Sequence, residues 1–373
     1  MAKKILTVYI GRFQPLHLGH VSILRQALDS SDLVLVLVGS SFAARTIKNP
    51  FTFIERADMI SGWKLADHRQ GRMLVLPLQD QPYNNAKWFQ SVQEKVELAV
   101  LDNWKSSEVE VRLTGSSRDE STWYLNSFPQ YIPNLKLAVP PGSGLNATSL
   151  RERLFNEIHS AAEWYDVPPT TLKFLTKFSN SKEFETLKDE YRFIEKYKSA
   201  WKAAPYAPTF MTADAVVVQS GHVLVVKRGA LPGRGLWALP GGFVKGYQTV
   251  QQAAVDEVIE ETGIRLADGK KAREITESIL LGSIKAKELF DDPQRSLRGR
   301  TITTAYLIRL DDTRPLPKVK GQFAPLEDTN GVEGVVETAD AFWLPIADAR
   351  SHSSLWFEDH HAILDTMLGL IKD

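Results

Sequence analysis

Short apolar runs alternate with amphipathic segments in the first half of the chain. The runs with the length of buried strands are 5–10, 33–38, 109–113 and 135–139. The segments with a helical period are 20–28, 88–101 and the stretch that begins at Ser149. Strands that alternate with helices predict a parallel sheet with crossover helices, so we expect a doubly wound α/β domain.

The pattern changes after a charged, helical stretch at 181–203 and the prolines that follow it. Two strands at 215–218 and 222–226 flank Ser220-Gly221, a plausible hairpin turn, and one long helix follows Thr249. A further strand is expected at 303–310. We therefore predict a first domain at 1–190, a linker at 191–206 and an α+β domain at 207–373.

The composition narrows the possible functions. Lysine and arginine together number 45, as do aspartate and glutamate, and there is no cysteine among the 373 residues. Without a basic excess we expect no nucleic-acid or membrane-surface binding, and without cysteine there can be no disulfide or thiolate zinc site. The apolar runs are too short to span a bilayer. We expect a cytoplasmic protein; a homo-oligomer is possible, and the oligomeric state stays open.

The first chemical motif follows the first predicted strand. Gly11-Arg12-Phe13-Gln14-Pro15-Leu16-His17-Leu18-Gly19-His20 leads directly into a predicted helix. A glycine permits close approach of the backbone to a ligand, and the N-terminus of a helix attracts phosphate. His17 and His20 share one face and could stabilise charge on a transferring phosphoryl group. The alternative is that one histidine caps the loop and the other packs.

The second motif is Asn146-Ala147-Thr148-Ser149-Leu150-Arg151 at a predicted helix start. Hydroxyls of Thr148 and Ser149 and the guanidinium of Arg151 could bind a triphosphate. A structural alternative is a capping box formed by Ser149 and Glu152.

Together these motifs resemble the nucleotidylyltransferase superfamily that carries the HxGH signature. The segments 44–56, 83–88 and 119–130 further resemble nicotinamide mononucleotide (NMN) adenylyltransferases fused to a Nudix domain. The resemblance implies a Rossmann-like first domain that forms NAD and pyrophosphate from NMN and ATP with a divalent metal, Mg²⁺ or Mn²⁺. It also implies that His17 and His20 contact the ATP phosphates and that Arg151 holds the leaving pyrophosphate.

The same resemblance suggests further substrate contacts in the first domain. Trp88 is a candidate to stack on the nicotinamide ring, although a core tryptophan is an equal alternative. Arg45 and Arg56 are candidates for phosphate contacts, with a solvated surface charge as the alternative for each. The other predicted substrate-binding residues here are Gly11, Arg12, Phe13, Asn84, Thr148 and Ser149.

An acidic helix is predicted in the second domain, after Gly241-Gly242. Thr249 and Gln252 fit a capping box and Gly263 fits a helix stop. Glu257, Glu260 and Glu261 have spacings that place them on one helix face, and oxygen ligands suit Mg²⁺ or Mn²⁺. A solvated acidic face is the alternative.

This segment resembles the Nudix box, with two departures. Gly242, Glu257, Glu260, Glu261 and Gly263 are among the matches. Gln248 stands where the box has glutamate, and Asp256 stands where it has the arginine that orients a catalytic glutamate. The resemblance gives Glu257 a catalytic role as well as a metal-binding one, and the two departures could lower the rate.

Residues 292–301 resemble Nudix proteins that act on ADP-ribose, releasing AMP and ribose 5-phosphate. Arg228, Arg295 and Arg298 are then candidate substrate contacts, with a surface loop as the alternative for Arg295 and Arg298. Glu333 and Glu337 are candidates for a further metal ligand. Two other hypotheses stay open: a Nudix domain that senses a nucleotide without cleaving it, and a first domain that adenylylates or cytidylylates another phosphate.

Overall fold

The computed structural model describes residues 3–63, 71–104, 108–115, 124–136, 146–156, 164, 166–319 and 338–371. Two compact units make up the chain, Met1–Asp189 and Glu190–Asp373. Within the described ranges, no helix is both long enough and apolar enough to cross a membrane.

The first unit is built on a parallel sheet of five strands. They are β1 (Lys4–Gly11), β2 (Leu33–Val38), β3 (Met73–Pro77), β4 (Val109–Gly115) and β5 (Ile132–Lys136). Their order is β3-β2-β1-β4-β5, and every pairing is parallel. This confirms the predicted Rossmann-like sheet. The last strand lies three residues earlier than predicted, and the short β3 was not predicted.

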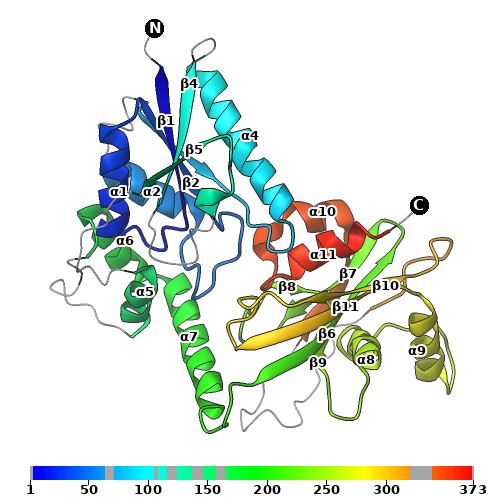
Figure 1. The fold of residues 1–373 in the computed structure, drawn as a ribbon. Helices are drawn as coiled ribbons and strands as arrows, with labels where there is room; N and C mark the ends of the chain where they lie inside the picture. The colour runs from blue at the N-terminus through cyan, green and yellow to red at the C-terminus, as the bar shows by residue number, and fades with distance from the viewer. Residues whose placement is uncertain are drawn as a thin grey trace. The chain divides into compact units, whose positions relative to one another are not determined.

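Helices cover both faces of this sheet. They are α1 (Leu18–Asp29), α2 (Phe53–Trp63) and α4 (Asn85–Asn103). The helices that follow in this part of the chain are α5 (Ala147–Phe155), α6 (Pro169–Phe178), which packs on α2, and α7 (Lys182–Ala200). Alternate β1 residues Leu6 and Val8 pack with Val92 and Val96 of α4, and α1 lies on the opposite face (Figure 1). The alternation follows from the period of two in a strand. The stretch 181–203, predicted to be helical, contains α7, which continues past the division between the units.

The second unit contains a mixed sheet of seven strands. They are β6 (Thr209–Gln219), β7 (His222–Arg228), β8 (Trp237–Ala238), β9 (Gly241–Phe243), β10 (Ile284–Phe290), β11 (Arg300–Arg309) and β12 (Thr338–Pro345). The main order is β10-β11-β6-β7-β12, with β8 on β7 and β9 on β6. Ser220 and Gly221 both have positive φ, 47° and 74°, which suits a two-residue hairpin and confirms the predicted turn.

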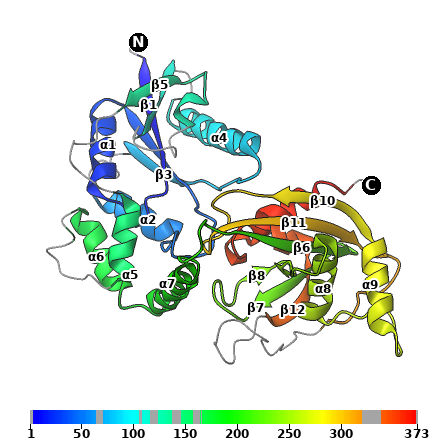
Figure 2. The same cartoon turned by 60° about the horizontal axis from the view of Figure 1, so that its bottom comes forward.

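Helices enclose this second sheet in a sandwich. They are α8 (Val250–Thr262), α9 (Ala272–Gly282), α10 (Ile346–Ser351), a 3₁₀ turn (Ser353–Leu355) and α11 (His360–Leu368). Helices α8 and α9 lie on one face, and α10 and α11 lie on the other (Figures 1 and 2). On the first face, Ala215 and Val217 of β6 pack with Val255 and Val258 of α8. The predicted mixed α/β Nudix sandwich is confirmed.

The ends of α8 match the sequence signals. The Thr249 hydroxyl accepts a hydrogen bond from the Gln252 N–H at 3.2 Å, which is one half of the predicted capping box, while the Gln252 side chain contacts Glu277 instead. At the other end, Gly263 has φ 60°. That left-handed conformation favours glycine and terminates the helix. The caps fix the register of α8 and so place Glu257, Glu260 and Glu261 in its last two turns.

Candidate active sites

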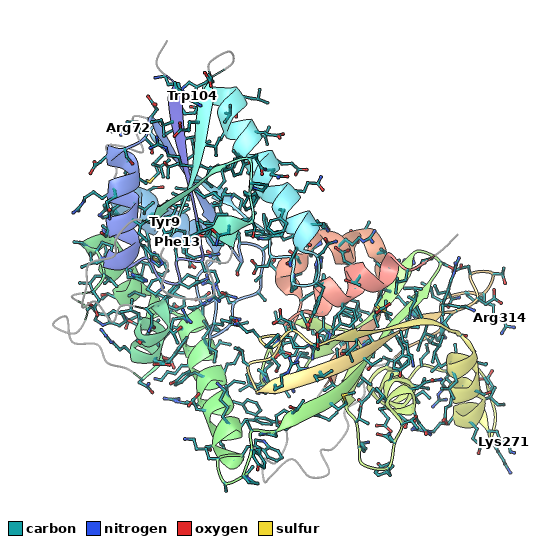
Figure 3. The ribbon with its side chains drawn as sticks, viewed as in Figure 1. Tyr9, Phe13, Arg72, Trp104, Lys271 and Arg314 are labelled. Atoms are coloured by element: carbon teal, nitrogen blue, oxygen red, sulfur yellow. The ribbon has the colours of Figure 1, made fainter. Side chains whose placement is uncertain are left out.

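The first motif lies where β1 ends. There β1 is flanked by β2 on one side and β4 on the other, which is the switch point where doubly wound sheets bind nucleotides. Phe13 has φ 52° and its ring lies edge-on to Tyr9 with centroids 5.3 Å apart (Figure 3). A Cβ at Gly11 would lie 3.0 Å from the Phe13 ring, so glycine gives the ring room.

Both histidines of this motif organise the start of α1. Nδ1 of His17 accepts from the Gly19 N–H at 3.1 Å, and Nδ1 of His20 accepts from the His17 N–H at 3.3 Å. The two rings stack with centroids 3.7 Å apart. Since each Nδ1 accepts, the proton of each neutral ring is on Nε2. The alternative in which one histidine caps and the other only packs is therefore incomplete: His20 packs against Phe13, with ring centroids 4.8 Å apart, but it also takes part in the cap.

Burial keeps these rings neutral. It lowers the pKa of His17 to about 4, and it lowers the pKa of His20 well below the ordinary value, with the charge of His17 as a second cause. Each ring at pH 7 is therefore a donor at Nε2, fixed in orientation by its own backbone contact. Fixed neutral donors suit a site where negative charge develops during a reaction.

Arg151 connects the second motif to the first. Its guanidinium donates to the Gln14 carbonyl at 2.8 Å and to the Thr148 hydroxyl at 3.1 Å. Burial, and secondarily the nearby charge of Arg12, lowers its pKa to about 10, which leaves it charged at pH 7. The structure thus brings Arg12, Thr148 and Arg151 to the same loop as the histidines.

The cap of α5 differs from the prediction. Asn146 is the N-cap residue, and its side-chain oxygen accepts from the Ser149 N–H at 2.7 Å. The predicted Ser149–Glu152 capping box is wrong because Ser149 already lies inside the helix. Its hydroxyl lies 3.1 Å from the Asn146 side-chain oxygen.

Arg56 has a role that the sequence did not reveal. It is completely buried, and its guanidinium donates to the carbonyls of Arg12 and Gly39 at 2.6 and 2.7 Å. Burial lowers its pKa to about 10. A solvated surface charge is therefore the wrong description. Arg56 holds together the loops that follow β1 and β2. Nothing in the sequence around Arg56 distinguishes it from an ordinary arginine on a helix surface.

The remaining predicted contacts of the first unit occupy structural positions. Arg45 forms two 2.8 Å hydrogen bonds with Glu55, and Asn84 caps α4 by accepting from the Lys87 N–H at 2.9 Å. Trp88 is half-buried, with its ring centroid 6.0 Å from that of Tyr124. These contacts leave the ligand roles of Arg45, Asn84 and Trp88 as predictions. The motif residues 119–123 lie outside the described ranges.

In the second unit, two glutamates of α8 lie against β9. Oε2 of Glu261 accepts from the Gly241 N–H at 3.0 Å. A Cβ at Gly242 would lie 2.5 Å from Oε1 of Glu257. The paired glycines therefore allow the backbone of β9 to approach both carboxylates.

Glu260 points to different partners. Its carboxylate lies 3.2 Å from the Arg273 guanidinium and 3.8 Å from the Lys245 ammonium. Across the described ranges, no three His, Asp or Glu side chains are close enough together to hold a metal ion. Glu257 and Glu261 share the β9 side and offer the oxygen donors that a hard divalent cation prefers. The proposed ligands Glu333 and Glu337 lie outside the described ranges.

The three predicted substrate arginines occupy a charged region of the second unit. Arg295 is buried and forms two 2.9 Å hydrogen bonds with Asp359; burial disfavours its charge, but Asp359 and Asp214 raise its pKa overall. Arg298 lies 3.8 Å from Glu358, and Arg228 lies 4.1 Å above the Phe357 ring. A solvated surface position for Arg295 is excluded.

Two acidic residues in the same region were not predicted. Glu190 of α7 accepts from the Gly233 N–H at 3.3 Å; burial raises its pKa to about 7, and Glu358 contributes in the same direction. Glu358 is buried with φ 46°, and its Oε1 has no hydrogen-bond partner within the described structure. Nothing local in the sequence distinguishes these glutamates from surface ones.

Comparison with known proteins accounts for both units. The family model for the NUDIX domain matches residues 208–365, and the cytidylyltransferase-like model matches 8–73. A solved bifunctional NMN adenylyltransferase/ADP ribose pyrophosphatase from Francisella tularensis is 31% identical, with a TM-score of 0.82, over 98% of this chain and 99% of its own. The chain belongs to this bifunctional family.

Shorter relatives match the first unit of this family member. The nicotinamide/nicotinic acid mononucleotide adenylyltransferase of Acinetobacter baylyi is 34% identical over 191 residues, 50% of this chain and 92% of the relative. A nicotinamide-nucleotide adenylyltransferase of Pyrococcus furiosus is 29% identical over 172 residues, 44% of this chain and 79% of the relative. The Francisella protein was crystallised with AMP and a manganese ion.

Proposed function

We propose that the first unit transfers the adenylyl group of ATP to NMN, producing NAD and pyrophosphate. The observation that carries the proposal is the pair of neutral histidines at the end of β1, whose Nδ1 atoms are occupied by backbone N–H groups. The Francisella relative with 31% identity bears this activity in its name. We also propose that the acceptor is NMN in preference to nicotinate mononucleotide.

The reaction needs positioned donors and no covalent intermediate. A phosphate oxygen of NMN attacks the α-phosphorus of ATP, the bond to the bridging oxygen of the β-phosphate breaks, and pyrophosphate leaves. Nε2–H groups of His17 and His20 stabilise charge on the reacting phosphoryl group, and Arg151 stabilises the leaving pyrophosphate. A divalent metal, which we propose is Mg²⁺, would supply charge neutralisation at the triphosphate.

A competition among acceptors tests this assignment. The purified chain is incubated with ATP, Mg²⁺ and an equimolar mixture of NMN, nicotinate mononucleotide, FMN and 4′-phosphopantetheine, and products are separated by chromatography. We expect NAD as the main product. A flavin or pantetheine adduct as the main product would replace NMN as the acceptor, and formation of no dinucleotide would reject the proposal.

For the second unit, we propose hydrolysis of ADP-ribose to AMP and ribose 5-phosphate. The supporting observation is that Glu257 and Glu261 both lie against Gly241-Gly242 despite the two departures from the box. Glu257 and Glu261 would hold Mg²⁺ or Mn²⁺, which would neutralise the diphosphate. Glu260, predicted as a third ligand, contacts Arg273 and Lys245 instead and would have to leave them to reach the same ion. Arg228 and Arg298 are proposed to contact the diphosphate or its flanking groups, and the buried Arg295 would support that region.

Product analysis separates hydrolysis from sensing. ADP-ribose is incubated with the protein and Mg²⁺ or Mn²⁺, and AMP is quantified, while calorimetry measures ADP-ribose binding. Release of AMP at a rate proportional to enzyme concentration supports hydrolysis. Binding without AMP release would favour the nucleotide-sensing alternative. If the protein neither binds ADP-ribose nor releases AMP from it, ADP-ribose is excluded as the ligand.

A further inference from the structure

The two departures from the Nudix box are in contact with each other. Nε2 of Gln248 donates to Oδ2 of Asp256 at 2.7 Å, and Oε1 of Gln248 accepts from the Lys245 N–H at 3.2 Å. The amide therefore uses both of its ends. It links the loop that follows β9 to the middle of α8, one residue before Glu257.

The contact observed here, an amide that donates to a carboxylate, uses both departures. The box has a carboxylate at 248 and a guanidinium at 256, so the donor is at 256. Here the acceptor is at 256, and an amide at 248 supplies the donor. A carboxylate at 248 could still accept from Lys245 but could not donate to Asp256, and two carboxylates would face each other. Glutamate at 248 with Asp256 would therefore break the contact, whereas Gln248 with arginine at 256 could bond only through the amide oxygen that here accepts from the Lys245 N–H.

An arginine from a neighbouring helix replaces the missing guanidinium. Arg273 of α9 lies 3.8 Å from Oδ1 of Asp256 and 3.2 Å from Oε1 of Glu260. Helices α8 and α9 lie side by side on the same face of the sheet (Figure 2). Asp256 and Glu260 thus share the guanidinium of Arg273, a residue outside the box.

We propose that Gln248 and Asp256 form a swapped positioning pair, in which the residue at 248 is the donor and the residue at 256 is the acceptor. The pair sets the loop after β9 against α8, and so keeps Gly241-Gly242 against Glu257 and Glu261. Neither residue touches substrate; both act through the glutamates. The inference rests on the proposed hydrolysis of ADP-ribose, but the contact itself and its effect on metal binding are independent of the substrate.

A double-mutant cycle in the full-length protein tests the pair. The variants are Gln248→Glu, Asp256→Arg and the double Gln248→Glu/Asp256→Arg, which reverses the donor and the acceptor. Each single variant is expected to lower kcat for AMP release about tenfold or more, with KM changed much less, because a hydrogen bond to a charged group is lost. The double variant is expected to recover to within about threefold of wild type.

A matched control and a second readout separate positioning from general damage. Gln252, also on α8, contacts the Glu277 carboxylate at 3.4 Å, so Gln252→Glu places the same charge in a similar contact away from β9. It should leave kcat unchanged. The affinity for Mn²⁺, measured from the paramagnetic resonance signal of free Mn²⁺ without substrate, should fall in the single variants and recover in the double.

The outcomes are decisive in either direction. Recovery of kcat and Mn²⁺ affinity in the double variant supports the swapped pair. Additive losses in the double variant, or equal loss in Gln252→Glu, would overturn it. If the wild type releases no AMP, the proposed function fails, and the cycle in Mn²⁺ affinity alone still supports or rejects the pair.

Discussion

The two candidate sites are organised by opposite electrostatic means. In the first unit, backbone N–H groups fix two imidazoles, and burial lowers the pKa of both, which keeps them neutral. In the second unit, charged groups fix one another, as in the buried Arg295–Asp359 pair and the contacts of Glu260 with Arg273 and Lys245.

This difference explains why one motif is intact and the other is altered. A histidine that uses Nδ1 for a helix cap and has Nε2 for the proposed ligand contact would have two geometric roles, and few residues could replace it. A hydrogen-bonded side-chain pair instead depends on one donor and one acceptor, so its members can exchange roles if both change. Gln248 and Asp256 fit that description. A residue that departs from a motif therefore indicates loss of function only if its contacts in the structure fail to replace those of the motif residue.

The largest expected effect concerns the buried ion pair of the second unit. Asp359→Asn leaves the Arg295 guanidinium, only 3% exposed, without its bidentate carboxylate. We expect the free energy of unfolding of that unit to fall by about 3 kcal/mol, because the buried guanidinium loses its hydrogen-bonded carboxylate and keeps only the more distant Asp214, at 4.0 Å. Urea unfolding followed by tryptophan fluorescence measures it.

The control for that variant is Asp365→Asn, in the more exposed Arg350–Asp365 pair. It should change the stability by less than about 1 kcal/mol. Equal effects of the two substitutions would mean that Arg295–Asp359 does not stabilise the second unit in the way described.

The second-largest expected loss of stability comes from the close packing of β9 against β6. A Cβ at Gly241 would lie 2.6 Å from the Ala213 carbonyl oxygen, so Gly241→Ala should push β9 away from β6. We expect a loss of about 1–3 kcal/mol in stability, and weaker AMP release since Glu261 loses its N–H partner. Gly246→Ala, where a Cβ meets nothing within 4 Å, is the matched control, and a similar loss there would refute the packing explanation.

Arg151→Lys examines whether the first site needs a guanidinium. Arg151 uses two nitrogens, one toward Gln14 and one toward Thr148, and a lysine keeps the charge but not the planar fork. We expect kcat for NAD formation to fall about tenfold, with AMP release from ADP-ribose unchanged. A lysine variant with wild-type kcat would show that charge alone is sufficient.

The smallest effect is a dependence of stability on mild acid. In the unfolded chain, a histidine has an ordinary pKa of 6.5, whereas in the folded protein burial lowers the pKa of His17 to about 4. Between these values the unfolded state binds more protons, so stability is complete above pH 6.5 and falls as the pH drops toward 4. Thermal unfolding from pH 7 to 4.5 should show less pH dependence in His17→Asn than in wild type; an identical profile would contradict the neutral-imidazole account.

The local pattern of apolar residues predicted much of the fold, because the strands of both sheets and the helices packed on them bury apolar residues at regular spacings. Strand β2 and the ends of α8 follow the sequence signals closely. What could not be predicted depends on contacts distant in the sequence. Arg56 is buried because it meets the carbonyl of Gly39, seventeen residues away in the chain, and the cap of α5 was misassigned because Asn146 competed with Ser149 for the same role.

Each unit is proposed to carry its own site, and a crossed pair of variants distinguishes two independent sites from a shared one. His20→Ala and Glu261→Gln are each assayed for NAD formation from NMN and ATP and for AMP release from ADP-ribose, with Mg²⁺ present. We expect His20→Ala to lower NAD formation by about 10²-fold or more and to leave AMP release unchanged, and Glu261→Gln to do the reverse. Loss of both activities in either variant, or of neither activity in both, would contradict the account.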